Sequence, residues 1–169
     1  MGILIFAIYI VYLGSILAFS IRATNKIFPY DIPHHYIWGL LLGSIGMIVI
    51  TAILQSILIP PRFDEFDVLV YILYVAPVGS LLGALTGSVI YLFECKEVRS
   101  ARHLSFFGSL PLVILCFWSI YNLTISPEQY LSNARDAVFW LFAYGFPLIW
   151  IPILWYWSFT NSKVSTQKT

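Results

Sequence analysis

Charged residues are scarce in this sequence. Asp, Glu, Lys and Arg make up 10% of its 169 residues, whereas hydrophobic residues make up 60%. A typical soluble domain has about 25% charged residues, so this composition excludes an ordinary globular domain and a disordered chain. The formal net charge is only +1, so the chain also lacks the basic surface that holds nucleic acid. The class that remains is a polytopic membrane protein.

Ionisable residues are also missing from the middle of every long apolar run. Proton pumps, voltage sensors and ion-coupled transporters depend on such groups within the membrane, and haem held between helices needs buried histidine ligands. Cys95 and Cys116 are too few for a disulfide framework. The sequence contains no nucleophile elbow and no phosphate-binding loop. We therefore expect no catalytic residues and no cofactor.

Five charge-free runs are each long enough to cross a membrane. A helix needs roughly 20 apolar residues to cross a hydrocarbon core of about 30 Å. We predict an all-α bundle of five transmembrane helices that forms a single domain over residues 1–169, with a short polar tail at 160–169. The first run is expected to be a retained helix, because no Lys or Arg precedes Arg22 as a signal peptide would require. The predicted spans are residues 3–21, 36–59, 68–93, 104–123 and 137–159.

Lys and Arg are distributed unevenly between the two sides that five spans create. One side has only Arg62 and Arg135, and the other has Arg22, Lys26, Lys96, Arg99, Arg102, Lys163 and Lys168. Because the basic side faces the cytoplasm, we predict an outer N-terminus and a cytoplasmic C-terminus, in a plasma or bacterial inner membrane. The loop holding Lys96, Arg99 and Arg102 is expected to prolong the third helix, with these cations on the headgroups of the lipid bilayer.

Small residues recur at helical spacing in two runs. The second run has Gly39, Gly43 and Gly46, and the third has Gly79, Gly83 and Gly87. Positions four apart lie on one face of a helix, and missing side chains let two helix backbones approach closely in lipid. We expect this glycine-zipper pattern to pack the two helices within the chain. The alternative is a face that docks a second copy or another membrane subunit.

The fifth run is rich in aromatic residues around a proline. Tyr144, Phe146 and Trp150 surround Pro147, where a kink is expected because proline removes a backbone donor. Pro111 is expected to kink the fourth run for the same reason. An aromatic wall at a kink can stack a flat ligand such as a quinone, pigment or tetrapyrrole. The alternative is aromatic anchoring at both span ends with ordinary packing between them.

Tryptophans fall at two depths in the predicted spans. Trp38, Trp140, Trp155 and Trp157 lie near span ends, where amphipathic rings favour the headgroup level. Trp118 and Trp150 lie deeper and are expected to pack against neighbouring helices.

The loop after the first run has the densest cluster of polar residues. Asp31, His34 and His35 are residue types that ligate zinc or iron. Adjacent histidines on a helix point about 100° apart, and no Cys or Glu completes the set. We therefore expect an interfacial turn and no metal site.

Three functions remain as hypotheses. The leading one is a non-catalytic accessory, assembly or partner-binding subunit, and the second is a carrier or binding protein for a neutral, apolar or flat small molecule. The third and least favoured is an interfacial membrane enzyme, which requires the first and third loops to converge. Its residues would be Asp31, His34, His35, Glu94 and His103.

Overall fold

The computed structural model describes residues 2–24, 34–58, 75–125 and 134–166, and within these ranges every regular element is a helix. The all-helical prediction is therefore confirmed for the described part of the chain. The helices are α1 (Gly2–Ala23), α2 (His34–Leu58), α4 (Ala76–Glu94), α5 (Val98–Phe107), α6 (Leu110–Ile125) and α8 (Ala134–Thr166).

Three described stretches are long and apolar enough to cross a membrane. They are His34–Ile53, Ala76–Glu94 and Val98–Asn122, and the apolar helix Ala7–Ala23 is shorter. Each stretch overlaps a predicted span. By length and composition these helices indicate a membrane protein.

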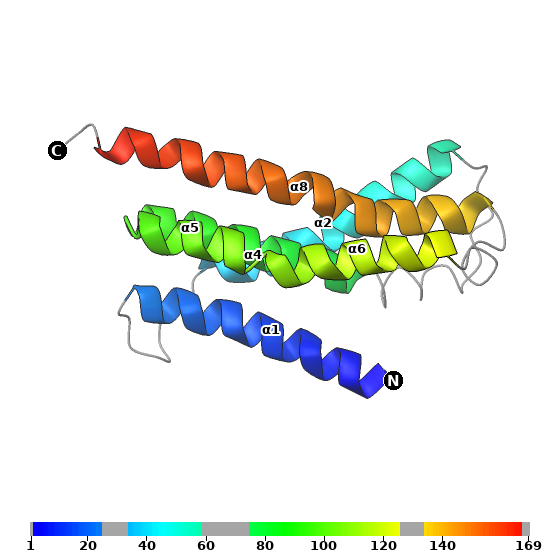
Figure 1. Ribbon diagram of the computed structural model, residues 1–169, viewed down its shortest axis with the longest axis horizontal. Coiled ribbons are helices and arrows are strands. Elements are labelled where there is room, and N and C mark those ends of the chain that lie inside the picture. The colour runs from blue at the N-terminus through cyan, green and yellow to red at the C-terminus, as the bar shows by residue number, and fades with distance from the viewer. Residues whose placement is uncertain (1, 25–33, 59–74, 126–133, 167–169) are drawn as a thin grey trace.

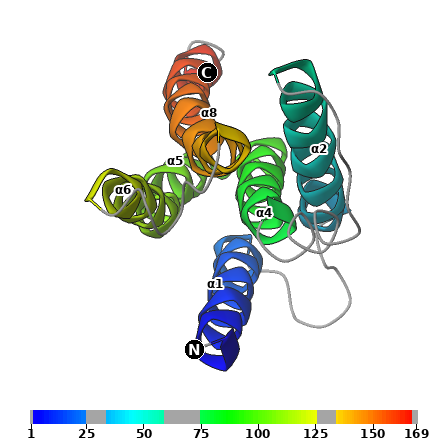
Figure 2. The ribbon, with the colours of Figure 1, turned by 90° about the vertical axis from the view of Figure 1, so that its right-hand side faces the viewer.

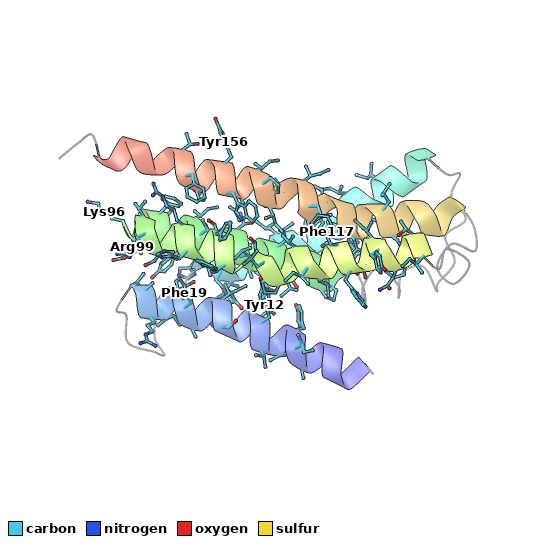
Figure 3. All side chains as sticks on the ribbon, viewed as in Figure 1. Tyr12, Phe19, Lys96, Arg99, Phe117 and Tyr156 are labelled. Carbon is cyan, nitrogen blue, oxygen red and sulfur yellow. The ribbon has the colours of Figure 1, made fainter. Side chains whose placement is uncertain are left out.

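Successive helices run in opposite directions along the long axis of the molecule, apart from α5 and α6, which follow one another (Figure 1). The end of α1, the start of α2, the end of α4 and the end of α8 therefore lie at one end of the molecule. Lys96 and Arg99 lie at this same end (Figure 3), and Arg22 is in the last turn of α1. We call it the basic end.

Helix α4 is the centre of the bundle. Viewed end-on, it lies between α2 and α8, with α1 on a further side (Figure 2), and it contacts α1, α2, α5 and α8. Its small residues allow this crowding, since Ala84, Gly87 and Ser88 are all buried. Tyrosine hydroxyls attach α1 to the rest of the bundle. Tyr9 Oη lies 2.5 Å from Ser80 Oγ, and Tyr12 (Figure 3) donates to the Gly108 carbonyl.

The fourth predicted span, residues 104–123, lies largely within the apolar stretch Val98–Asn122, which is divided into α5 and α6. Gly108, between the two helices, keeps right-handed helical backbone angles (φ −67°, ψ −26°), and its amide donates to the Leu104 carbonyl at 2.8 Å. Pro111 explains the division, because it has no amide hydrogen for the Phe107 carbonyl and its ring crowds that carbonyl. Proline is tolerated in the first turn of a helix, which is where α6 has it.

The prolines of the fifth span do not divide its helix. Helix α8 continues through Pro147 and Pro152 without interruption and ends at Thr166, seven residues beyond the predicted boundary at 159. No glycine or proline occurs at positions 160–166, so nothing in the local sequence ends the helix there. The predicted polar tail at 160–169 is therefore helical as far as Thr166.

The loop between α4 and α5 is a tight turn, so the prediction that it prolongs the third helix is wrong. The Lys96 amide donates to the Phe93 carbonyl at 3.0 Å, and the Glu97 amide donates to the Leu92 carbonyl at 2.9 Å. This pair of bonds is a Schellman motif. Lys96 has a φ of 63°, in the left-handed region where glycine is usual. The turn starts a new helix, so Arg99 and Arg102 belong to α5.

Candidate ligand groove

The closest helix contact in the described part of the chain is made by glycines of α2 and α4. A Cβ added to Gly39 would collide with the Gly83 carbonyl, and one added to Gly43 would collide with the Gly79 carbonyl. A Cβ on Gly87 would collide with the carbonyl of His35. The five predicted packing glycines therefore meet one another inside one chain, with the two backbones in direct contact.

A groove lies beside this contact, bounded by α2, α4 and α8. Its volume is about 450 Å³, which is within the usual range for small-molecule sites, roughly 300–1,000 Å³. Helix α2 contributes residues from His35 to Ile50, α4 contributes residues from Gly79 to Ile90, and α8 contributes Phe146 and Trp150. In Figure 2 the two flanking helices, α2 and α8, lie on either side of α4.

Missing side chains on α2 create this space. Gly39, Gly43 and Gly46 all line the groove, and a Cβ added to Gly46 would meet no atom within 4 Å. Gly39 and Gly43 are needed for contact with α4, but Gly46 simply leaves room. A larger residue at position 46 would therefore fill the groove without disturbing the helix contact.

Phe146 and Trp150 of α8 form one wall of the groove, and α4 forms its floor. A hydrogen bond joins this wall to the floor. Trp150 Nε1 donates to Thr86 Oγ1 at 3.1 Å, and Thr86 Oγ1 donates to the Leu82 carbonyl at 2.8 Å. The rings of Phe146 and Trp150 stack with centroids 6.1 Å apart. Because the hydroxyl and the indole N–H bond each other, this wall presents mainly apolar surface to the groove.

Tyr144, the third residue of the predicted wall, is not among the residues that line the groove. Its ring stacks on Trp140 with an interplanar angle of 4°, and it packs against a core cluster that includes Met47 and Ala143. Residues 144, 146 and 150 do not all share one helix face, since they are separated by two and four positions. Phe146 and Trp150 thus line the groove, whereas Tyr144 packs with them against the same core cluster without reaching the groove.

A polar pair marks the end of the groove nearest the basic end. His35 Nε2 lies 3.2 Å from Glu94 Oε1, and their side chains are 42% and 57% exposed. His35 also lines the groove, and its ring centroid is 6.4 Å from that of Tyr91. The antiparallel packing of α2 on α4 brings His35 close to Glu94. In the sequence, His35 belongs to the polar segment after the first apolar run and Glu94 to the polar segment after the third.

The other candidate residues of that polar set do not join the pair. His34 is exposed on α2, and His103 lies on α5, with its ring 6.2 Å from that of Phe107. Asp31 lies outside the described residues. Within the ranges that the structure describes, no three His, Cys, Asp or Glu side chains are grouped so that they could hold a metal ion.

The three cations predicted to contact lipid headgroups lie in two different environments. Lys96 and Arg99 are exposed at the basic end (Figure 3). The Arg102 guanidinium lies over the Phe159 ring, 5.5 Å from its centroid, and its Nε is buried without a hydrogen-bond partner among the described residues. Lys96 and Arg99 are thus the two that face outward.

Trp118, expected to pack against a neighbouring helix, is instead 63% exposed, so this prediction is wrong. Trp155, expected at the headgroup level, donates from Nε1 to the Ser105 carbonyl at 2.8 Å and to Ser109 Oγ at 2.9 Å. These hydrogen bonds join α8 to the chain around the end of α5, and the sequence analysis did not anticipate them.

Comparison of this chain with protein-family models, curated proteins and solved structures finds no match in any of the three.

Proposed function

We propose that the chain is a five-span membrane protein with its N-terminus outside and its C-terminus in the cytoplasm. The alternating direction of the helices (Figure 1) supports five crossings. The gathering of Arg22, Lys96 and Arg99 at one end supports the orientation, because basic residues are retained on the cytoplasmic side. A C-terminal fluorescent-protein fusion is expected to fluoresce, whereas a C-terminal alkaline phosphatase fusion is expected to be inactive. The reverse pattern would overturn the orientation.

The function proposed for this bundle is to bind a neutral, apolar small molecule in the α2–α4–α8 groove. The observation that carries the proposal is the groove of about 450 Å³, with glycine on its floor and the stacked pair Phe146 and Trp150 on its wall. Sites for small molecules are typically concave and mainly apolar, with few polar groups. Rigid stacked rings provide a large contact area at little cost in side-chain entropy.

The contacts of the glycines favour this function over an accessory subunit. The accessory hypothesis was motivated by the small-residue packing faces, together with the lack of a catalytic constellation and the short loops. Gly39, Gly43, Gly79, Gly83 and Gly87 instead contact each other across α2 and α4, so their close approach is already used. Among the described residues, the enzyme hypothesis is supported by the pair His35 and Glu94.

Photolabelling with an uncharged long-chain hydrocarbon that carries a diazirine tests the binding function. In nanodiscs, the wild-type chain is expected to be labelled preferentially at groove residues of α2, α4 and α8. Gly46→Phe is expected to remove most of this labelling, because the ring fills the open space beside Gly46.

The matched control is Gly145→Phe. Gly145 also has open space beside its Cα position but is not among the residues that line the groove. This variant is expected to keep the wild-type labelling pattern. Labelling spread evenly over the lipid-facing surface, and unchanged by Gly46→Phe, would contradict the proposed function.

A further inference from the structure

The groove is long relative to its volume. Its lining residues on α2 extend from His35 to Ile50, and fifteen residue steps along a helix cover about 22 Å. A ligand that fills about 450 Å³ over this length is extended along the α2–α4 pair. A linear hydrocarbon chain fits this shape better than a compact ring system, because it can follow the glycine floor from one end to the other.

The two ends of the groove differ in chemistry. The end farther from His35 is formed by Met47, Ile50 and Gly79. The Met47 sulfur, a weak acceptor, is the sole hydrogen-bonding side-chain group among these three residues. The other end has His35, which among the described lining residues is the one with an ionisable side chain. The Thr86 hydroxyl, next to the Gly87 that packs on the His35 backbone, is engaged by Trp150 and by the Leu82 carbonyl. An extended ligand therefore meets a polar partner at one end.

Glu94 orients the ring of that partner. A carboxylate oxygen 3.2 Å from His35 Nε2 favours a hydrogen on that nitrogen. The other nitrogen, Nδ1, accepts a hydrogen bond when the ring is neutral and donates one when the ring is protonated. A hydroxyl pairs with either form because it both donates and accepts, whereas an alkane has nothing to offer. A carboxylate headgroup also lacks the proton and would be repelled by the nearby negative charge of Glu94.

We propose that the groove binds a linear amphiphile with one neutral hydroxyl headgroup, in the manner of a long-chain or isoprenoid alcohol. The hydroxyl forms a hydrogen bond with His35, and the hydrocarbon chain lies along the glycine floor between α2 and the wall formed by Phe146 and Trp150. This assignment rests on the proposed function of the groove as a ligand site, and it adds the chemical class and direction of the ligand.

Three diazirine probes of equal chain length test this assignment: a primary alcohol, a carboxylic acid and an alkane. We expect the alcohol to label the wild-type groove about three- to tenfold more strongly than the other two, the range for one net hydrogen bond. His35→Phe is expected to lower the alcohol to the level of the alkane. His35→Gln, which keeps an acceptor oxygen, is expected to restore much of the preference.

The neighbouring histidine provides a matched control. His34 is exposed on the same turn of α2 and does not appear among the groove-lining residues, so His34→Phe is expected to leave the alcohol preference unchanged. Glu94→Gln removes the negative charge beside His35 and is expected to raise labelling by the acid relative to the alcohol.

Equal labelling by alcohol and alkane that Gly46→Phe abolishes for both would overturn the headgroup assignment and leave the groove function standing. A preference for the acid would overturn the headgroup assignment and also the neutral character of the proposed ligand, with the groove still the binding site. Labelling of the groove by none of the probes, or labelling that Gly46→Phe does not change, would overturn the proposed function and the headgroup assignment together.

Discussion

The α2–α4 contact and the α5–α8 contact join helices by opposite means. Between α2 and α4 the glycines bring backbone against backbone, and a Cβ on Gly39, Gly43 or Gly83 would collide with the facing helix. Between α5 and α8 the side chains form hydrogen bonds. Trp155 reaches Ser105 and Ser109, and Ser158 Oγ lies 2.9 Å from Ser105 Oγ.

The difference explains where the molecule is hollow. Lipid supplies no hydrophobic force between helices, so they associate through close packing of small residues or through polar side chains. Close packing of glycines leaves nothing beside the contact, and the groove lies there. At the α5–α8 contact Trp155 bonds to Ser105 and Ser109, and the buried serines Ser105 and Ser158 bond to each other.

The largest expected effect is the loss of the α2–α4 contact in Gly83→Leu. The new side chain would meet the backbone of Gly39 and Gly43, which can yield only if the two helices separate. We expect the free energy of unfolding to fall by at least about 3 kcal/mol, measured by titration with a denaturing detergent. Gly14→Leu is the control, since its Cβ has open space on α1. Equal stability of the two variants would refute the close contact.

An intermediate effect is expected at the α5–α8 contact from Trp155→Phe. The smaller ring keeps most of the packing but loses the donor to Ser105 and Ser109. Hydrogen bonds between helices in membranes contribute modestly, so we expect a loss of about 1–2 kcal/mol in the same titration. The control is Trp118→Phe at an exposed position. If both substitutions had the same effect, the hydrogen bonds of Trp155 would not be stabilising the contact.

The smallest expected effect concerns the turn at Lys96. This turn joins α4, which takes part in the α2–α4 contact, to α5, which takes part in the α5–α8 contact. Lys96→Gly relieves the left-handed conformation, whereas Lys96→Ala removes the same charge and keeps the conformational cost. We expect the glycine variant to be more stable than the alanine variant by roughly 1 kcal/mol, seen as a higher melting temperature in detergent. An alanine variant as stable as the glycine variant would argue against strain at Lys96.

Several features of the fold follow from local sequence. The apolar runs predict the helices because a backbone in lipid must satisfy its own hydrogen bonds. The four-residue spacing of glycine predicts two helix faces without side chains, and the structure has those faces in contact. The division between α5 and α6 lies just before Pro111, where the ring crowds the Phe107 carbonyl.

Other features depend on which helices become neighbours, which no local pattern contains. Phe146 and Trp150 line the groove, whereas Tyr144 stacks on Trp140 and does not line it. Trp155 bonds to serines 46 and 50 positions earlier in the chain. His35 meets Glu94 because antiparallel packing brings the start of α2 to the end of α4. The sequence by itself thus determined the helices and their small-residue faces, since both depend on residues a few positions apart. Only the tertiary structure decided the groove and its polar end, since both depend on how three helices pack.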